Sequence, residues 1–307
     1  MTKQTPVLIA GTGAMACLFA AKLSGAGVPV LMSGTWRAGL QALRQEGVRL
    51  VDSQGNQQVF PVQVAEGGCG SRVCHALVLV KSWQTGRAAR QLSECLEANG
   101  LALSLQNGLG NQERLVQALG PERVALGVTT AGATLLGPGR VRPAGEGSIV
   151  LGKHPRLAPL AELLGSAGFV IEESADTNSL LWSKLVINAA VNPLTALLNV
   201  PNGELLNRPA ARALLAEAAR EAATVATALD IQLSYQDPVA VCEAVARRTA
   251  ANRSSMLQDL QRSAPTEIDA ICGAIVHAGE GAGIPTPINR TLWHLIKARV
   301  EGTATQP

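Results

Sequence analysis

Short apolar runs alternate with helical patterns through the first half of the chain. Four of the runs are continuous and short, which is typical of buried strands. They lie at residues 6–10, 28–33, 75–80 and 101–105. Helical spacing of apolar residues follows each run, at residues 14–25, 37–46, 86–97 and 112–119. A hairpin is expected over residues 48–51 and 58–64. This alternation predicts an α/β domain with a doubly wound parallel sheet.

The pattern changes after about residue 176. Glycine-punctuated β segments over 124–152, a helix at 157–166 and a strand at 169–172 come before the change. Only long Ala- and Leu-rich helical patterns follow, at residues 179–198, 209–228, 237–250, 266–280 and 291–299. Helical periodicity without strand patterns predicts an all-α domain. We therefore expect two domains, residues 1–175 and 176–307, which suits a chain of 307 residues.

Composition excludes several classes of protein. Hydrophobic residues make up 47% and charged residues 16%, which is incompatible with a disordered or highly charged fibrous chain. Aromatic residues are only 3% and the net charge is only +3, so a nucleic-acid-binding surface is not expected. A small molecule is the expected partner, and a homodimer is left open.

The six cysteines form no C-x-x-C pair and have no histidine at ligand spacing, so no metal site is expected. Their mostly apolar surroundings predict small core residues in a reducing compartment. No apolar run has the length and flanks of a signal peptide or an uninterrupted membrane span. We therefore expect a cytoplasmic protein that does not bind membranes.

A glycine-rich hexapeptide joins the first predicted strand to the first helix. It consists of Gly11, Thr12, Gly13, Ala14, Met15 and Ala16. This G-x-G-x-x-A pattern is typical of dinucleotide binding, in which Gly11 permits the tight turn and Gly13 lets the backbone approach a pyrophosphate. Ala16 permits close packing of helix on strand. The alternative is a glycine-rich turn without a ligand.

The segment after the second predicted strand, residues 32–37, favours NADP. Enzymes that use NAD usually carry an acid there, which would repel a 2′-phosphate. This segment has no acid, two hydroxyls and Arg37. In the alternative interpretation, Arg37 is only a solvated residue at a helix start.

Lys184 lies in an otherwise mostly apolar helical segment, residues 180–192. Asn188 and Asn192 follow it at i+4 and i+8, so the three side chains share one face. Burying a lysine and two amides is costly unless they are paired or open onto a polar cleft. A lysine in such a place can have its pKa lowered and serve as a proton donor. The alternative is a surface stripe on an amphipathic helix.

Other polar residues also have purely structural explanations. Glu267 follows Pro265 at an expected helix start, where it could simply complement the helix dipole. The pair Ser254 and Ser255 could be only an N-cap. Lys81 and Asn107 each follow a predicted strand, at the carboxyl ends where doubly wound sheets bind ligands, but a snorkelling lysine and an ordinary turn explain them as well.

Taken together, the motifs are those of a known family. They are G-T-G-A-M-A at 11–16, V-K-S-W-Q at 80–84, Q-N-G-L-G-N at 106–111, W-S-K-L-V-I-N-A-A-V-N-P-L-T-A-L at 182–197, P-N-G-E-L at 201–205, N-R-S-S-M-L-Q-D at 252–259 and T-E-I-D at 266–269. Over nearly its whole length the chain resembles the ketopantoate reductase (2-dehydropantoate 2-reductase) family.

The resemblance implies a Rossmann-type domain joined to a helical domain, and the NADPH-dependent reduction of ketopantoate in pantothenate synthesis. It implies that Lys184 is the general acid, with Glu267 as its partner or as the acceptor of a substrate hydroxyl. The side chains implied to contact the substrate are Asn107, Asn188, Asn192 and Ser255. Those implied along the cofactor are Lys81, Gln84 and Asn107. Two alternatives stay open, namely a reductase of another branched 2-oxo acid and a non-catalytic NADP-binding sensor.

Overall fold

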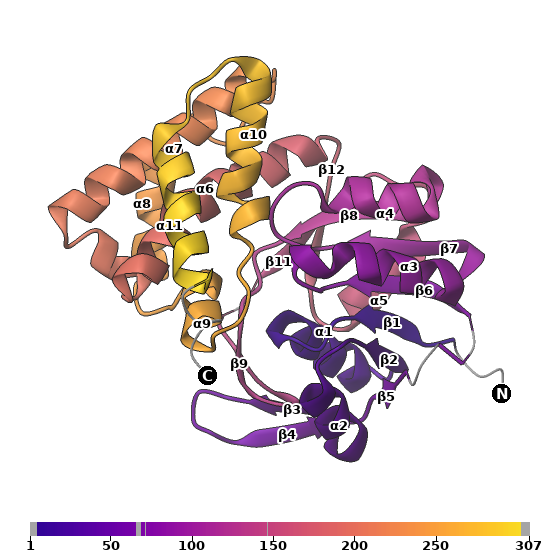
Figure 1. Ribbon diagram of the computed structural model, residues 1–307. Helices are drawn as coiled ribbons and strands as arrows, with labels where there is room; N and C mark the ends of the chain where they lie inside the picture. Colours follow the sequence, from indigo (N-terminus) through magenta and orange to yellow (C-terminus); the bar gives the residue numbers. More distant parts are fainter. Residues whose placement is uncertain (1–4, 66–68, 71, 146, 302–307) are drawn as a thin grey trace. The chain divides into compact units, whose positions relative to one another are not determined.

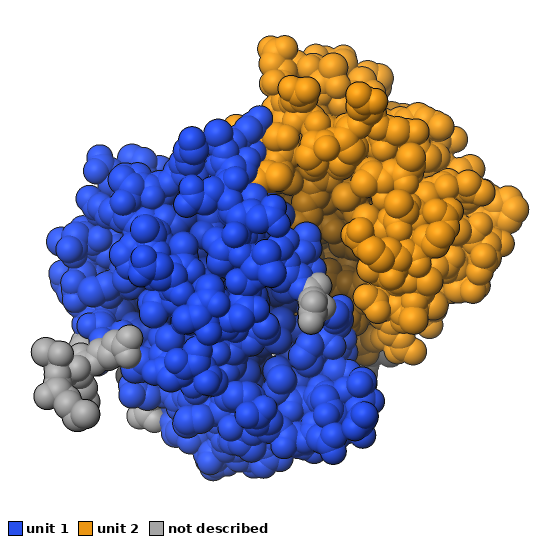
Figure 2. Space-filling model, turned by 180° about the vertical axis from the view of Figure 1, so that it is seen from behind, with its two compact units in different colours: residues 1–106, 111–177 blue, residues 107–110, 178–307 orange. Residues whose placement is uncertain are grey.

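The structure, a computed structural model, describes residues 5–65, 69–70, 72–145 and 147–301. It divides into two compact units, which Figure 2 distinguishes by colour. Unit 1 comprises Met1–Gln106 and Asn111–Thr177, and unit 2 comprises Asn107–Gly110 and Asn178–Pro307. Unit 2 thus includes a four-residue segment that interrupts unit 1 in the sequence.

Unit 1 is built on an eight-stranded sheet (Figure 1). In spatial order its strands are β12 (Val170–Ser174), β11 (Ser148–Gly152), β8 (Val124–Thr129), β7 (Leu96–Ser104), β6 (Val73–Val78), β1 (Val7–Ala10), β2 (Val30–Ser33) and β5 (Gln63–Val64). Every pairing is parallel except that of β11 with β8. The predicted doubly wound α/β sheet is therefore confirmed.

Helices cover both faces of this sheet. Because alternate residues of a strand point to opposite faces, a single strand contributes to the core on each side. Val7 and Ile9 of β1 belong to a buried cluster with residues of α1 (Ala14–Gly25) and α5 (Ala158–Ser166). Leu8 belongs to a different cluster, with residues of α3 (Thr85–Cys95) and α4 (Asn111–Leu119). The helix α2 (Arg37–Glu46), also in unit 1, contacts β5.

A second, four-stranded sheet packs on α1. Its order is β4 (Gln57–Phe60), β3 (Val48–Val51), β10 (Arg140–Pro143) and β9 (Ala133–Gly137). Because α1 contacts strands of both sheets, it is buried on nearly all sides, which explains why its sequence is apolar apart from Lys22 and Ser24 in the last turn. The predicted hairpin is confirmed for β3 and β4, whereas residues 63–64 pair with β2 in the main sheet.

Unit 2 is helical, as predicted. Its helices are α6 (Thr177–Leu198), α7 (Pro209–Ala228), α8 (Pro238–Arg248), α9 (Ser255–Gln261), α10 (Cys272–Ala282) and α11 (Pro287–Glu301). They share one apolar core, to which α6 contributes residues along most of its length. By length and composition alone α6 could cross a membrane, although no membrane span was predicted from the sequence. However, 67% of that stretch is buried within the protein, as in a core helix.

One predicted helix is wrong in its first turn. Residues 266–280 do not form a single helix, because a short 3-10 turn, η4 (Ile268–Ala270), precedes α10. Ile271 separates the two with φ −105° and ψ −90°, which are not helical angles. Glu267 therefore precedes a 3-10 turn and not an α-helix.

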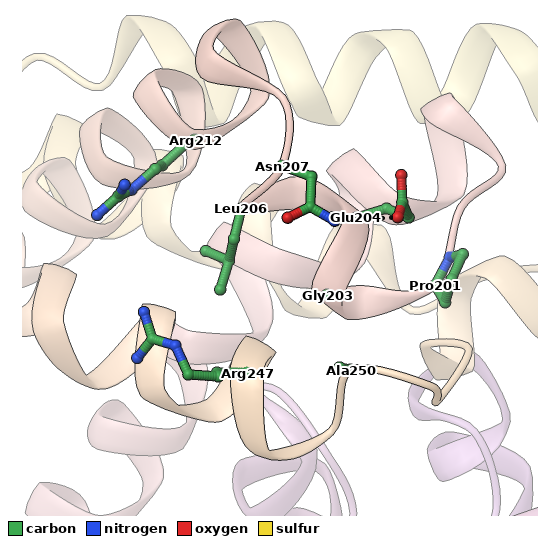
Figure 3. A pocket seen from close by; sticks show the side chains of 8 residues that line it. All are labelled: Pro201, Gly203, Glu204, Leu206, Asn207, Arg212, Arg247 and Ala250. Carbon is green, nitrogen blue, oxygen red and sulfur yellow. Dashed lines mark hydrogen bonds between the residues drawn. The ribbon is translucent and has the colours of Figure 1, made fainter.

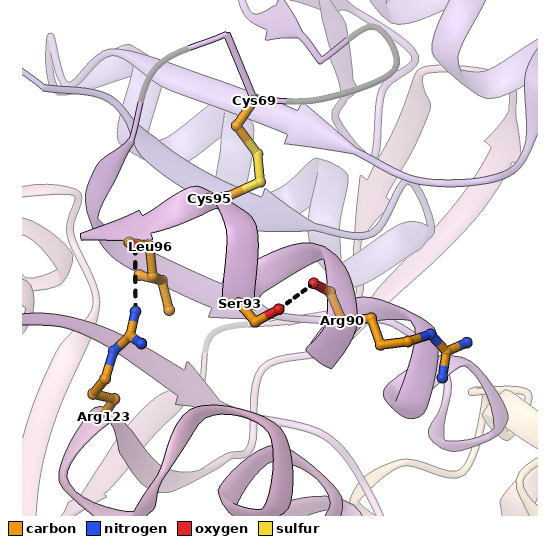
Figure 4. Close-up of a disulfide and its surroundings, with 6 residues drawn as sticks. All are labelled: Cys69, Arg90, Ser93, Cys95, Leu96 and Arg123. Atoms are coloured by element: carbon orange, nitrogen blue, oxygen red, sulfur yellow. Dashed lines mark hydrogen bonds between the residues drawn. A yellow bond between two sulfur atoms is a disulfide. The ribbon is translucent and has the colours of Figure 1, made fainter. Parts of the chain in front are cut away.

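A disulfide joins Cys69 to Cys95, the last residue of α3 (Figure 4). The expectation that the cysteines are reduced is wrong for this pair. The pairing could not be predicted from the sequence, because the two residues lie 26 positions apart and only the fold brings their Cα atoms to 5.5 Å. Cys17, Cys74, Cys242 and Cys272 are free thiols, and all of these except Cys74 are buried.

Candidate functional site

The G-x-G-x-x-A turn joins β1 to α1 as the sequence predicted. Gly11 has φ +138°, and a Cβ on it would lie 2.9 Å from the carbonyl oxygen of Leu79, so only glycine suits this position. A Cβ on Gly13 would meet no atom within 4 Å, so the backbone there borders open space. Gly13 is the N-cap of α1, and its side-chain-free position leaves the first N–H groups of the helix for an anion. These features fit a dinucleotide pyrophosphate.

The carboxyl ends of β1, β2 and β6 meet at one edge of the sheet, where Ala10 pairs with Ser33 and with Val78. The chain reverses its direction of winding between β1 and β6, and doubly wound folds bind their ligands beside such a switch point.

Several polar groups gather near the end of β2. Ser33 is buried, and among the described residues nothing hydrogen-bonds its hydroxyl. Gln84 Nε2 donates to Thr35 Oγ1 at 3.1 Å, which places the V-K-S-W-Q segment against the loop after β2. Arg37, the first residue of α2, is exposed, and Lys81 is the N-cap residue of the 3-10 turn η1 (Ser82–Gln84). This donor set fits an adenosine ribose and its phosphate.

A buried hydrogen-bond network links the end of β7 to α3 and α4. Gln106 Nε2 donates to the carbonyl of Val80 at 3.0 Å and to Thr85 Oγ1 at 2.8 Å. The Thr85 hydroxyl donates in turn to Asn111 Oδ1 at 2.8 Å, and Ser104 donates to Gln106 Oε1 at 3.1 Å. Gln106 and Asn111 flank the four-residue segment that belongs to unit 2, so the network fixes both ends of that segment.

The segment itself, Asn107–Gly110, packs on the turn η4. The Leu109 N–H donates to the carbonyl of Ala270 at 3.0 Å. Gly108 has φ +80°, and a Cβ on it would lie 2.5 Å from the same carbonyl oxygen, so a side chain is excluded. The structure therefore groups Asn107 with the residues around Glu267.

Lys184 lies on α6, and Asn188 and Asn192 continue its face over two further turns. Burial lowers the pKa of Lys184 to about 8, and the nearby Glu267 carboxylate opposes this shift. Asn188 is half-buried and Asn192 is buried. A lysine with a lowered pKa beside two amides can bind a carboxylate through hydrogen bonds and donate a proton to a neighbouring carbonyl oxygen as it becomes an alkoxide.

The turn of α6 that carries Lys184 is held by its neighbour Ser183. The Ser183 hydroxyl accepts the N–H of Ser234 at 2.8 Å, and the Tyr235 hydroxyl donates to the Ser183 carbonyl, also at 2.8 Å. These contacts tie α6 to the loop before α8. They restrict movement of the helix at Lys184.

Glu267 is 5% exposed, yet its side chain makes no capping bond with the turn that it precedes. Its backbone carbonyl instead accepts the N–H groups of Ala270 and Ile271, each at 3.1 Å. The explanation of Glu267 as a helix-dipole partner at an α-helix start is therefore wrong. A buried carboxylate near a lysine is typical of a functional site.

Ser254 and Ser255 have different positions. Ser254 is the N-cap of α9 and accepts the Leu257 N–H at 3.1 Å, so the capping explanation is correct for this residue. Ser255 is the first residue of the helix and is half-buried. It stays a candidate for substrate binding.

Two family models cover the chain. The model described as ketopantoate reductase PanE/ApbA matches residues 7–156, and that of the C-terminal part of the same family matches residues 176–300. The chain belongs to the ketopantoate reductase family. It is therefore an oxidoreductase that depends on a pyridine nucleotide.

Relatives of this ketopantoate reductase family member span almost its full length. A 2-dehydropantoate 2-reductase of Halobacterium salinarum is 34% identical, over 95% of this chain and 97% of its own. That of Archaeoglobus fulgidus is 36% identical, over 96% and 98%.

Solved structures agree in fold. A PanE/ApbA family ketopantoate reductase from Ralstonia eutropha JMP134 is 31% identical with a TM-score of 0.89, covering 97% of this chain and 99% of that one. A D-mandelate dehydrogenase, in a ternary structure with NADH and anilino(oxo)acetate, is 27% identical with a TM-score of 0.91, covering 98% and 100%.

The P-N-G-E-L segment of this family member lines a surface pocket of about 420 Å³ in unit 2 (Figure 3). Its lining residues are Pro201, Gly203, Glu204, Leu206, Asn207, Arg212, Arg247 and Ala250. None of the predicted site residues is among them. The pocket is therefore separate from the Lys184 face.

Sequence reasoning missed the residues that hold the candidate site in place. Thr85, Gln106 and Asn111 make buried side-chain contacts that only the fold reveals. Ser183 and Tyr235 do the same for α6. The Q-N-G-L-G-N motif already contains Gln106 and Asn111, so the motif was the available signal.

Proposed function

We propose that this protein catalyses the NADPH-dependent reduction of 2-dehydropantoate (ketopantoate) to (R)-pantoate, a step in the synthesis of pantothenate and coenzyme A. The observation that supports this most directly is Lys184, whose pKa is lowered to about 8 by burial, near a buried carboxylate and on one face with two amides. That combination suits a 2-oxo acid, because the ketone needs a proton donor and the carboxylate needs donors of hydrogen bonds.

In this proposal Lys184 protonates the ketone oxygen. Its positive charge stabilises the alkoxide that develops there, and its ammonium then gives up the proton. A nicotinamide, when bound, would supply the hydride for the ketone carbon. Asn188, Asn192 and Ser255 hold the carboxylate and hydroxyl groups of the substrate. Glu267 accepts a hydrogen bond from the terminal hydroxyl of the substrate, or its negative charge keeps Lys184 protonated.

In this proposal most of the cofactor-binding residues belong to unit 1, whereas Asn107 belongs to unit 2. Residues 11–16 take the pyrophosphate at the start of α1, and Lys81, Gln84 and Asn107 lie along the cofactor. We propose NADP over NAD because residues 32–37 contain no acid, Ser33 has a buried hydroxyl without a partner among the described residues, and Arg37 is exposed nearby.

The decisive experiment is an NADPH-oxidation assay with purified protein and ketopantoate. Turnover with ketopantoate, at a kcat/KM well above that for 2-oxoisovalerate, supports the proposal. Absence of turnover with any 2-oxo acid, while NADPH still binds, would leave the non-catalytic sensor as the better explanation.

A second candidate is a reductase of another branched 2-oxo acid. The likeness to D-mandelate dehydrogenase, whose solved complex contains NADH, favours it, because the same fold there serves a different enzyme. The two candidates differ in what Glu267 is for. A buried carboxylate suits a substrate with an additional hydroxyl and disfavours one without it. The ratio of kcat/KM values for the two substrates therefore separates them.

We also propose that the enzyme works in the cytoplasm. The Cys69–Cys95 disulfide is the observation that stands against a fully reducing compartment. Fractionation of cells, with detection of the protein by antibody, tests the location. Gel filtration with light scattering tests whether the protein is a homodimer.

A further inference from the structure

Two buried hydroxyls join the two motifs that are most specific in the sequence. Thr195 of the N-P-L-T stretch and Ser254 of the S-S-M-L stretch lie 59 positions apart, and their side-chain oxygens are 2.7 Å from each other. Thr195 is 0% exposed and Ser254 is 6% exposed. A buried hydroxyl pair of this kind holds two elements together, because neither partner can be satisfied by water instead.

The Thr195 end of the contact sits at an interruption in α6. Pro193 has no N–H, so the carbonyl of Ala189 loses the helical hydrogen bond that residue 193 would donate. The Cys272 thiol lies 4.0 Å from that carbonyl and takes part of its place. Thr195 Oγ1 lies 3.0 Å from the carbonyls of both Val191 and Asn192, so its hydroxyl is tied to the turn of α6 that includes Asn192.

The Ser254 end sets the start of α9. Ser254 Oγ accepts the Leu257 N–H at 3.1 Å and thereby fixes the direction in which this short helix begins. Ser255 is the next residue, so its backbone position is fixed once Ser254 is held. The Thr195–Ser254 contact thus connects the turn of Asn192 to the start of the helix at Ser255.

We propose that Thr195 and Ser254 are positioning residues that keep the side chains of Asn192 and Ser255 at a fixed separation for the substrate. This inference rests on the proposed function, in which Asn192 and Ser255 bind the 2-oxo acid. Neither Thr195 nor Ser254 needs to touch the substrate itself.

A double-mutant cycle tests the inference. T195V keeps the shape and removes the hydroxyl, T195S keeps the hydroxyl, and S255A removes the substrate contact. We expect T195V to raise KM for ketopantoate about tenfold with a smaller effect on kcat. T195S, which keeps the hydroxyl, should have nearly the KM of the wild type. The double variant T195V/S255A should have nearly the KM of S255A alone, because a displaced Ser255 has already lost its contact.

The control is T249V, which removes a hydroxyl that accepts from Asn202 Nδ2 at 2.9 Å in the same unit. Both valine variants should lower the melting temperature, but only T195V should raise KM. Additive effects of T195V and S255A on KM, or a KM unchanged in T195V, would overturn the positioning role. A KM unchanged in S255A would instead remove Ser255 from the substrate site, which is a failure of the proposed function.

Discussion

The indole N–H of Trp293 donates to the Asp269 carboxylate at 2.7 Å. Lys297 donates to the same oxygen at 3.2 Å, so two residues of α11 hold one side chain of η4. Trp293 also packs against Gly273 at the start of α10, where a Cβ would lie 3.0 Å from the ring. Glu267 is two residues before Asp269, so α11 holds the turn that carries the buried carboxylate.

Replacing Trp293 with Phe should loosen that turn and change the titration of Lys184. Glu267 raises the pKa of Lys184, so displacing it should lower this pKa below its value of about 8. The decline of kcat/KM at high pH should then begin at lower pH than in the wild type. A pH series with ketopantoate measures this.

The matched control for Trp293→Phe is Arg290→Met. This change breaks the Arg290–Glu280 contact of 2.8 Å, which also joins α10 and α11. It should leave the pH profile in place. An unchanged pH profile in Trp293→Phe as well would show that the Trp293–Asp269 contact does not determine the position of Glu267.

Removing Lys184 should abolish most activity. Lys184→Ala loses the proton donor and the positive charge together, which should cost roughly 10² or more in kcat. NADPH affinity should hardly change, because the cofactor residues other than Asn107 belong to unit 1. In the wild type, kcat/KM should fall as pH rises through about 8, because only the protonated lysine can donate. Near-normal turnover in the variant would leave the lysine with a structural role.

The cofactor should be NADPH. Since residues 32–37 contain no acid, NADPH should bind at least about tenfold tighter than NADH, a difference of about 1.4 kcal/mol. Titration of both cofactors, followed by fluorescence, gives the two Kd values. Arg37→Ala should reduce the ratio of the NADH Kd to the NADPH Kd. An unchanged ratio in that variant would point to Ser33 or Thr35 as the phosphate contact, and equal affinities in the wild type would refute the preference.

Glu267 should set the substrate preference. If it accepts the hydroxyl of ketopantoate, a 2-oxo acid without that hydroxyl leaves a buried carboxylate unpaired. The wild type should therefore prefer ketopantoate over 2-oxoisovalerate by roughly 10² in kcat/KM. Glu267→Ala should lose most activity with ketopantoate and much less with 2-oxoisovalerate. A preserved ratio with a lower melting temperature would indicate that Glu267 only stabilises its turn.

Reduction of the Cys69–Cys95 bond should destabilise unit 1. The bond closes a loop over 26 positions, and for a loop of this length the loss is about 3.5 kcal/mol in the free energy of unfolding. Urea denaturation with and without dithiothreitol measures it, and the variant C69S/C95S serves as the control that should not respond to the reductant. Equal midpoints for the wild type in both conditions would mean that the two thiols are not paired in solution.

Elements with a strong local pattern could be predicted from the sequence. The helix Ala14–Gly25 and the helix Pro209–Ala228 have the predicted bounds, because apolar spacing and a fold-defining glycine or proline mark their ends. The common face of Lys184, Asn188 and Asn192 followed from helical spacing alone. Such features depend on residues that are neighbours in sequence.

Features that depend on distant residues could not be predicted. The turn η4 breaks the expected helix although residues 266–280 have helical spacing, and the contacts that hold it come from Trp293 and Leu109. The partners of Gln106 and the contact of Thr195 with Ser254 likewise join residues far apart in the chain. A single sequence marks these residues as polar but does not say which of them meet.

The placement of Asn107–Gly110 also bears on how the chain folds. The segment is synthesised between the two parts of unit 1, but the carbonyl that receives it, that of Ala270, is made near the end of the chain. As the chain emerges from the ribosome, the first unit can be complete on either side of a loop whose docking surface does not yet exist. The contact between this early segment and the residues around Glu267 can therefore form only after Ala270 has been synthesised.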